Sequence, residues 1–324
     1  MTWLMLVGGL VLLLVGGELL VRGAVRVASQ LGVSPLIIGL TLVGFGTSTP
    51  ELVTSVQAAM NGSPGIAFGN IVGSNIANLL LILGASALVS PIIVQSSALR
   101  RDAVVMVAVA IVFAMLSPLF PLGRLIGILF VAALGIYIYV AFRQEAAATA
   151  THGAAFDKSA AAQGADPALA PVPPQGGSLV VPLLTSLLGL GIVVVGGYFL
   201  VNGAVALARS FGISETIIGL TIVAVGTSMP ELVTSLVAAV RREADVAFGN
   251  IIGSNIYNIL GIGGVTALIT PSQVPPQIAG FDNIVMVAVS ALVVVLAYTG
   301  RRLARWEGAV LVAGYIVYVW WLWP

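Results

Sequence analysis

The sequence predicts an all-α membrane protein in which ten transmembrane helices form two inverted five-helix repeats. The chain of 324 residues is 59% hydrophobic and only 8% charged, whereas soluble domains carry roughly 25% charged residues. Apolar windows of about 20 residues, the length that crosses a hydrocarbon core, recur along the whole chain. A polar motif set in apolar sequence begins at Gly39 and again at Gly219. These three observations together define the fold class.

Ten apolar segments can be marked in chain order. The first begins at the N-terminus but lacks the basic region and the small-residue cleavage site of a signal peptide. Its GGELLVRGAV stretch (residues 16–25) also aligns with GGYFLVNGAV (residues 196–205), so we keep it as the first helix. The predicted spans lie near residues 3–27, 34–59, 66–90, 102–118, 123–142, 179–207, 214–239, 246–270, 283–299 and 306–323.

The two sets of five spans are joined by a segment that the composition predicts to be a flexible cytoplasmic linker. Residues 143–178 are rich in Ala, Pro and Gly, a composition that does not bury a core. The expected organisation is therefore a first repeat over 1–142, the linker, and a second repeat over 179–324. The linker is too short and too poor in acidic residues for a calcium-sensing domain.

The overall charge and the missing cysteines exclude several classes of function. A net charge of +1 and the absence of a large basic patch give no indication of nucleic-acid binding. The chain has no cysteine, which removes disulfides, thiolate catalysis and zinc–sulfur sites. The only histidine, His152, falls in the linker, so a membrane-embedded hydrolase would lack a base beside its nucleophile. We expect no enzyme activity, no cofactor and no obligate protein partner.

The basic residues predict the orientation in the membrane. Under the ten-span prediction only Arg124 and Arg209 fall at one membrane face. The crowded face is expected to be cytoplasmic, so both termini should face outward. Because five spans is an odd number, the second repeat must be inserted upside down, and in such transporters the substrate site lies at the midplane. The crowded face holds Arg22, Arg26, Arg100, Arg101, Arg143, Lys158, Arg241, Arg242, Arg301, Arg302 and Arg305.

The repeated motif places one acid deep in each half. GLTLVGFGTSTPELVTSVQAAM begins at Gly39 and GLTIVAVGTSMPELVTSLVAAV at Gly219, and 15 of these 22 positions are identical. An ionisable group at that depth costs about 2.5–3.5 kcal/mol on insertion scales, and the chain accepts this cost at both Glu51 and Glu231. Structural hydrogen-bonded acids are the alternative interpretation. Glu18 is different, because Arg22 lies one turn on and either a local ion pair or snorkelling of the side chain towards the interface explains it.

Each of these acids follows a proline that should break its helix. Proline removes a backbone donor and clashes with the carbonyl four residues earlier. We expect the carbonyl groups near Gly44 and Ala224 to face a cation, which is tolerated at membrane depth where protein or water satisfies them. A simple kink, with Thr and Ser bonding their own backbone, is the alternative. Thr47 and Glu51, and likewise Thr227 and Glu231, are four residues apart and share a helix face.

A second repeated motif supplies hydroxyl and amide groups. AFGNIVGSNIAN (67–78) and AFGNIIGSNIYN (247–258) share ten of twelve positions. Their glycines should let these helices approach closely. Asn75 and Asn255 are expected either to support the ligands from behind or to bond backbone. Helices 2, 3, 7 and 8 are thus all expected to be broken around one site. Its remaining polar members are Ser48, Ser74, Asn78, Ser228, Ser254 and Asn258.

The expected ligands are all oxygen atoms, which disfavours soft metals. Ca²⁺ takes six to eight oxygens in flexible geometry, whereas Mg²⁺ demands a tighter octahedron, and two carboxylates neutralise the charge of Ca²⁺. Na⁺ can use the same carboxylates with the serine and asparagine oxygens, so the two ions would exclude one another. Buried carboxyl groups can also carry protons, so a proton/calcium antiporter is the alternative. A channel is a further alternative, distinguished by flux that neither saturates nor needs a counter-ion.

The doubled GTSxPE and GSNIxN motifs resemble the two α-repeats of the sodium/calcium exchanger family, within the cation/calcium exchanger superfamily. The resemblance covers both halves and implies ten helices, alternating access and electrogenic exchange of several Na⁺ for one Ca²⁺ across the cell membrane. It implies a calcium site made by Glu51, Glu231, Thr47 and Thr227, and sliding of spans 1 and 6. It also implies sodium sites that use Ser48, Ser74, Ser228 and Ser254.

One position departs from part of that family. Potassium-dependent members have Asp where this chain has Asn258. Because Asn78 and Asn258 are both neutral, the site would carry only the two negative charges of Glu51 and Glu231. The sequence therefore gives no support for a potassium requirement. The long regulatory loop of eukaryotic relatives is also missing. Under an inward sodium gradient, the predicted net direction is calcium extrusion.

Overall fold

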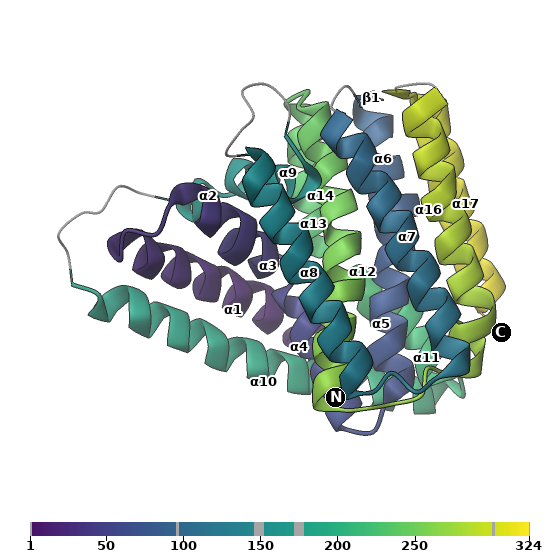
Figure 1. Ribbon diagram of the computed structural model, residues 1–324. Coiled ribbons are helices and arrows are strands. Elements are labelled where there is room, and N and C mark those ends of the chain that lie inside the picture. Colours follow the sequence, from purple (N-terminus) through teal and green to yellow (C-terminus); the bar gives the residue numbers. More distant parts are fainter. Residues whose placement is uncertain (1, 95–96, 146–151, 172–177, 300–301, 324) are drawn as a thin grey trace.

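The computed structural model describes residues 2–94, 97–145, 152–171, 178–299 and 302–323. Within these ranges the regular structure is helical, apart from one short antiparallel ladder (Figure 1) and an isolated antiparallel bridge between Leu122 and Ser272. The ladder joins β1 (Ile92–Ile93) to β2 (Arg302–Leu303), with Ile92 opposite Leu303. It ties the first half of the chain to the second at the end of the molecule that is uppermost in Figure 1.

The first half runs from α1 to α8. Its elements are α1 (Thr2–Gln30), α2 (Pro35–Ile38), the π-helical turn η1 (Gly39–Val43), α3 (Gly44–Gly46), α4 (Thr49–Met60), α5 (Pro64–Ala77), the π-helical turn η2 (Asn78–Ile82), α6 (Leu83–Val89), α7 (Ser97–Leu119) and α8 (Arg124–Glu145).

The second half repeats this order of elements. It comprises α10 (Val180–Phe211), α11 (Glu215–Ile218), the π-helical turn η4 (Gly219–Val223), α12 (Ala224–Thr227), α13 (Met229–Val240), α14 (Ala244–Ile256), the π-helical turn η5 (Tyr257–Gly263), α15 (Gly264–Ile269), the π-helical turn η6 (Ile278–Asp282), α16 (Asn283–Thr299) and α17 (Arg305–Leu322). Between the halves lie α9 (Ala154–Ala165) and the 3-10 turn η3 (Pro167–Leu169).

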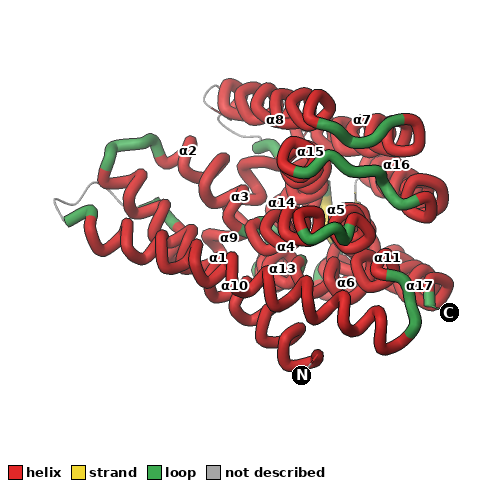
Figure 2. The backbone as a smooth tube through the Cα atoms, turned by 90° about the horizontal axis from the view of Figure 1, so that it is seen from below, coloured by secondary structure: helices red, strands yellow, loops and turns green. Residues whose placement is uncertain are grey.

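The helices divide into an interior pair and an apolar periphery. Seven helices in the described ranges are long and apolar enough to cross a membrane, or eight if one bent pair counts as a span. The helices Pro64–Val89 and Ala244–Ile269 have 83% and 89% of their apolar window buried, against 22–33% for the other five. In Figure 2, α5 and α14 accordingly lie inside, with α7, α8, α16 and α17 around them. The peripheral helices expose Leu, Ile and Val, as expected of surfaces in lipid.

The two longest helices, α1 and α10, pack together as an antiparallel pair that lies obliquely to the rest (Figure 1). Glycines make this close packing possible. A Cβ added at Gly16 would lie 2.7 Å from the backbone nitrogen of Val193, and one added at Gly23 would lie 2.5 Å from that of Ser186. Any larger residue at these positions would force the two helices apart.

The prediction of broken helices is correct for helices 2 and 7 and wrong for helices 3 and 8. The chain breaks at Ser48 and at Ser228, and the second break bends the helix by 48°. The helices Pro64–Val89 and Ala244–Ile269 are instead continuous, each with a π-helical turn inside it. Neither GSNI motif contains a proline, so nothing removes a backbone donor there.

The prediction that residues 143–178 form a flexible linker also fails where the structure describes them. Residues 143–145 complete α8, and Ala154–Ala165 form the helix α9, which packs against α14 and α13. Residues 146–151 and 172–177 of the predicted linker lie outside the described ranges. Low hydrophobicity did not prevent burial here, because small residues let α9 approach its neighbours closely: Gly249 and Gly253 of α14 face Asp157 and Lys158. Ala154, Ala155, Ala161 and Ala162 are almost fully buried.

Candidate cation-binding site

The two breaks position the two glutamates. Ser48 and Ser228 stand where the helices break, and each break is followed by a proline in the first turn of the next helix. Glu51 and Glu231 lie in the first turns of α4 and α13 and are 2% and 1% exposed. A helix N-terminus favours negative charge. The sequence Ser-x-Pro-Glu thus holds each carboxylate at a helix start in the protein interior.

Each carboxylate is held by the serine of the other half. The Ser228 hydroxyl donates to Glu51 Oε1 at 3.1 Å, and the Ser48 hydroxyl donates to Glu231 Oε1 at 3.2 Å. The second oxygen, Oε2, of both glutamates is buried without a hydrogen-bond partner in the part of the chain that the structure describes. Burying a charged oxygen unpaired is costly. A site for a positively charged ligand would require buried carboxylate oxygens of this kind.

Two asparagines that the sequence analysis did not single out fix the backbone of the glutamates. Asn70 donates to the Glu51 carbonyl oxygen at 3.2 Å, and Asn250 donates to that of Glu231 at 3.3 Å. Asn70 also accepts the Thr227 hydroxyl at 2.9 Å, which joins the two halves. The available signal was their place in both copies of the AFGN sequence, where they are the only polar side chains.

The second-half break is closed by hydrogen bonds around Ala224. The Ala224 carbonyl oxygen accepts the Ser228 amide at 3.1 Å, the Ser74 hydroxyl at 3.4 Å and the Thr227 hydroxyl at 3.3 Å. The prediction of a freed carbonyl at Ala224 is therefore wrong in this conformation, because the helical bond to Ser228 is made. Ser74 does reach across from the first half, so the structure brings Ser74, Thr227 and Ala224 together.

The first-half break is more open. The Ser48 amide bonds to the Phe45 carbonyl at 3.1 Å, one residue short of the α-helical acceptor Gly44. Gly44 accepts only a long hydrogen bond, 3.4 Å, from the Thr47 hydroxyl among the bonds described. Thr47 is half-buried, and no described hydrogen bond ties its side chain to either glutamate. The expected freed carbonyl is thus found on this side alone.

The amide groups of the GSNIxN motifs form a second layer. Asn78 donates to Asn255 Oδ1 at 2.9 Å, and Asn255 donates to the Asn75 carbonyl at 3.4 Å. Asn75 donates to the Ile71 carbonyl at 2.7 Å, so Asn75 and Asn255 bond backbone as predicted. The Oδ1 atoms of Asn78 and Asn258 are buried without a partner in the described ranges. Among the hydrogen bonds of the described residues, none links Asn78 or Asn258 to a glutamate.

A residue that the sequence analysis placed in a loop reaches the site. The Lys158 ammonium lies 3.1 Å from Glu231 Oε1 and 2.5 Å from the Ser254 hydroxyl. Ser254 in turn donates to Glu231 Oε1 at 3.4 Å. Lys158 is 0% exposed, and its Nζ lies 5.9 Å from the centre of the Tyr257 ring. No sequence pattern pointed to this contact, because Lys158 looked like one more cytoplasmic charge.

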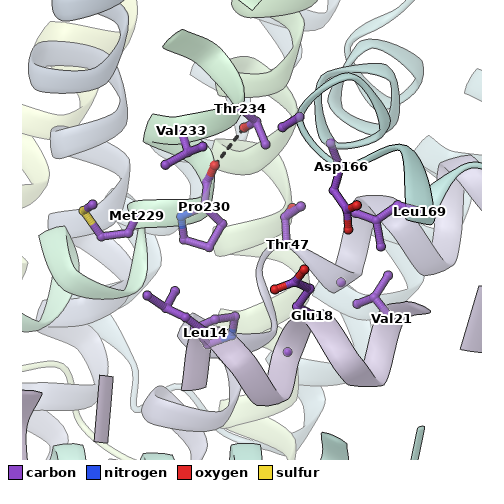
Figure 3. Close-up of a pocket in the computed structure, with 15 residues that line it drawn as sticks. Leu14, Glu18, Val21, Thr47, Asp166, Leu169, Met229, Pro230, Val233 and Thr234 are labelled. Carbon is purple, nitrogen blue, oxygen red and sulfur yellow. Dashed lines mark hydrogen bonds between the residues drawn. The ribbon is translucent and has the colours of Figure 1, made fainter. Parts of the chain in front are cut away.

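A cavity of about 330 Å³ adjoins the site (Figure 3). It is lined by Thr47 and Pro50 at the first break and by Pro230 and Thr234 of α13, so it lies next to both glutamate-bearing turns. Its other lining residues come from α1, α3, α13 and the segment from α9 to η3, and they are Leu14, Gly17, Glu18, Val21, Gly46, Ala162, Ala165, Asp166, Leu169, Met229 and Val233.

Acidic side chains stand at the edge of this cavity. Glu18 pairs with Arg22 one turn on in α1, which confirms the predicted local ion pair. Arg22 also bonds Asp166 at 2.8 Å, so α1 is tied to the end of α9. The described residues contain no group of three or more His, Cys, Asp or Glu side chains that could hold a metal. A cation here would depend on two carboxylates with hydroxyl, amide and carbonyl oxygens.

Sequence comparison decides the family. The model of the sodium/calcium exchanger protein family matches residues 1–143 and 181–323. The chain belongs to the sodium/calcium exchanger family. Membership identifies it as a membrane antiporter of the cation/calcium exchanger class and not as an enzyme. The match leaves out residues 144–180, the segment that contains α9.

Similar proteins cover the exchanger over nearly its full length. CaxA of Alkalimonas amylolytica is 39% identical over 313 residues, which are 96% of this chain and 95% of CaxA. The sodium/calcium exchanger MaX1 of Methanosarcina acetivorans is 34% identical and covers 98% of this chain and 97% of MaX1. The solved structure of the sodium-calcium exchanger NCX_Mj soaked with Na⁺ and Sr²⁺ is 32% identical, covers 98% and 96% of the two chains and gives a TM-score of 0.62.

Proposed function

We propose that the exchanger moves Ca²⁺ across the cell membrane in exchange for Na⁺, by alternating access to one site between its two halves. The observation that carries the proposal is the crossed pair of buried glutamates. Each accepts a serine hydroxyl from the opposite half, and each keeps one buried oxygen without a partner among the described residues. A cation between these oxygens would be bound by both halves, and its release would require them to move.

The donor set favours calcium as the divalent ion. Two carboxylates balance the charge of Ca²⁺, and the flexible six-to-eight-oxygen shell of Ca²⁺ can be completed from hydroxyl and carbonyl groups. Glu51 and Glu231 are the central ligands, with Thr47, Thr227 and the carbonyl groups of Gly44 and Ala224 beside them. The Ala224 carbonyl can take this role only in a conformation in which its present hydrogen bonds are loosened.

Sodium is the proposed counter-ion because neutral oxygens surround the carboxylates. Ser48, Ser74, Ser228 and Ser254 offer hydroxyl groups, and Asn78 and Asn258 offer amide oxygens. Four of these six side chains already bond a glutamate or the Ala224 carbonyl. The sodium/calcium exchanger MaX1 carries both ions in its name, which supports the same choice here.

The membrane arrangement that fits this function has ten spans in two inverted repeats, over residues 1–142 and 179–324. It adds α2–α4 and α17 to the eight apolar candidates. The 18-residue α17 is about 27 Å long, with exposed Trp306 near one end and Trp320 near the other. Tryptophan gathers at membrane interfaces, which supports a spanning α17.

We place both termini outside and α9 on the cytoplasmic side of a plasma or inner membrane. Basic residues gather near α9, since Arg22 bonds Asp166 and the Arg241 guanidinium lies close to Gly164. The inward sodium gradient would then drive calcium out of the cell.

The test is calcium uptake by purified exchanger in proteoliposomes loaded with Na⁺ and diluted into sodium-free buffer. We expect uptake that needs internal Na⁺ and that is lost in both Glu51→Gln and Glu231→Gln. Uptake that ignores Na⁺ but follows an imposed pH gradient would replace Na⁺ by H⁺ as the counter-ion. Normal transport by both variants would show that the two glutamates are not the site.

A further inference from the structure

The helix α9 packs on the glycine face of α14. The equivalent glycine face of α5, in the first half, is covered instead by η4 of the second half. In the first half, Gly69 and Gly73 of α5 face η4, and added Cβ atoms would lie 2.9 Å from the Gly219 Cα and 2.5 Å from the Leu220 carbonyl oxygen. The matching glycines of α14, Gly249 and Gly253, face α9 instead. An added Cβ at Gly253 would lie 3.0 Å from the Ala154 carbonyl oxygen.

The Lys158 side chain extends from α9 along this face of α14 to the candidate cation site. Its ammonium bonds Glu231 and Ser254, and Ser254 is the counterpart of Ser74. Ser74 bonds the Ala224 carbonyl across the halves. Ser254 thus bonds Lys158, whereas its counterpart Ser74 bonds a backbone carbonyl of the opposite half. A fully buried ammonium requires a specific partner, and here the partner is a proposed cation ligand.

Both ends of the α9 segment are anchored. At its start, the Ala154 amide donates to Asp102 Oδ2 at 2.8 Å, where the negative charge also suits a helix N-terminus. At its end, Asp166 bonds Arg22 of α1. Alanines pack one face of α9, with Ala155 against Leu40 and Ala141. The segment is therefore docked along its length and does not rest on the lysine alone.

We infer that α9 is an intramolecular plug, in which the Lys158 ammonium occupies the cation site in place of a transported ion. The inference rests on the proposed function, because it takes Glu231 as a ligand of the transported cation. The plug closes the site from the side of the membrane on which α9 lies. It is a property of the segment between residues 143 and 181, which the family model does not match.

The charges predict which ion expels the plug. Two carboxylates with Lys158 leave one net negative charge, which a single Na⁺ would balance. Ca²⁺ with Lys158 would instead leave one net positive charge in a buried site, where unbalanced charge is strongly unfavourable. Ca²⁺ and the lysine should therefore exclude one another, whereas the lysine tolerates one Na⁺. Only molecules with the plug undocked can then bind calcium. The apparent calcium affinity therefore equals the intrinsic affinity multiplied by the undocked fraction.

The direct test uses the fact that Lys158 is the only lysine in the chain. Purified full-length exchanger is treated with an amine-acylating reagent, and modification of Lys158 is followed by mass spectrometry. We expect slow acylation in buffer that contains only a bulky organic cation, and acylation roughly tenfold faster in saturating CaCl₂. Equal rates in the two buffers, fast or slow, would overturn the plug.

Transport of a charge-deleted variant gives the second test. Lys158→Gln should raise calcium uptake at subsaturating Ca²⁺, with half-saturation roughly tenfold lower if the plug is docked in about nine-tenths of molecules. The control is Arg143→Gln, which removes one positive charge from an exposed position at the end of α8 and should leave uptake unchanged. Half-saturation equal to wild type in Lys158→Gln would overturn the plug.

The two proposals fail differently. If Ca²⁺ releases Lys158 but uptake does not need Na⁺, the plug stands and the counter-ion in the proposed function is wrong. If sodium-dependent uptake is normal but Ca²⁺ leaves Lys158 protected, the plug is wrong and the proposed function stands.

Discussion

The two halves of this exchanger carry nearly the same motifs but give them different neighbours. In the first half, the glycine face of α5 meets the backbone of η4 from the second half. In the second half, the same face of α14 meets α9, a helix that belongs to neither repeat. A glycine face specifies only that something must approach closely. Which element approaches depends on what the rest of the chain supplies.

The hydrogen bonds differ in the same way. Thr227 donates to Asn70 across the halves at 2.9 Å, whereas its counterpart Thr47 bonds only the Gly44 carbonyl of its own helix, at 3.4 Å, among the bonds described. Asn250, the counterpart of Asn70, has a buried Oδ1 without a partner in the described ranges. The polar groups on the side that holds α9 thus make fewer hydrogen bonds between the halves than their counterparts, among the residues described. Removing α9 would leave room for the missing contacts to form.

The largest expected effect comes from breaking the ion pair between Lys158 and Glu231. Glu231→Gln leaves the Lys158 ammonium without its ion partner, and breaking a buried pair in this way costs about 3–5 kcal/mol. We expect α9 to undock, with acylation of Lys158 in calcium-free buffer at least as fast as in the calcium-saturated wild type. Glu51→Gln is the matched control, because Glu51 bonds Ser228 and no described bond joins it to Lys158. Equal protection of Lys158 in the two variants would contradict this difference between the halves.

An intermediate effect is expected from the two glycine faces. Gly73→Ala places a methyl group 2.5 Å from the Leu220 carbonyl oxygen, and overpacking against backbone costs about 1–3 kcal/mol. Gly249→Ala instead meets the side chain of Asp157 on α9, which can leave the groove. Thermal unfolding in detergent should therefore show the larger loss for Gly73→Ala, while Lys158 becomes reactive only in Gly249→Ala. Equal losses of stability in the two variants, with Lys158 protected in both, would contradict the proposed difference between the glycine faces of α5 and α14.

The smallest effect concerns the anchor of α9. Asp102→Asn removes the negative charge beside the first turn of α9, which is worth about 1 kcal/mol, so Lys158 should be acylated roughly fivefold faster. Asp282 is the equivalent buried acid of the second half, but it accepts the Tyr318 hydroxyl at 2.9 Å and is not described as touching α9. Asp282→Asn should leave the acylation rate unchanged. An equal rise in both variants would mean that Asp102 does not hold the plug.

The sequence predicted those parts of the site that depend on chemistry alone. Glu51 and Glu231 stood out because carboxylates in apolar sequence require an explanation, and each is bonded by the serine of the opposite half. Pro50 and Pro230 placed the two breaks correctly, because a missing donor acts locally. The predicted breaks in helices 3 and 8 were wrong, since small polar residues do not by themselves interrupt a helix. The number of spans and the orientation stay predictions.

The docking of Lys158 could not be predicted, because it depends on tertiary packing. The alanine-rich stretch of α9 has no apolar period that would indicate a buried face, and its groove exists only after α14 has packed. The free carbonyl predicted at Ala224 fails for a related reason. Whether that group is free depends on whether Ser74 and Thr227 close over it, which is a matter of conformation. Sequence identifies candidate ligands more readily than the conformation in which they are found.

The glycine seam between α1 and α10 has a mechanical consequence. Because added Cβ atoms along it would strike backbone, the two helices should behave as one stiff rod. Short connections tie this rod to both broken helices, through residues 31–34 after α1 and residues 212–214 after α10. Since the helices are antiparallel, these ties lie at opposite ends of the rod. A shift of the rod along its length would therefore pull on one broken helix while it pushes on the other.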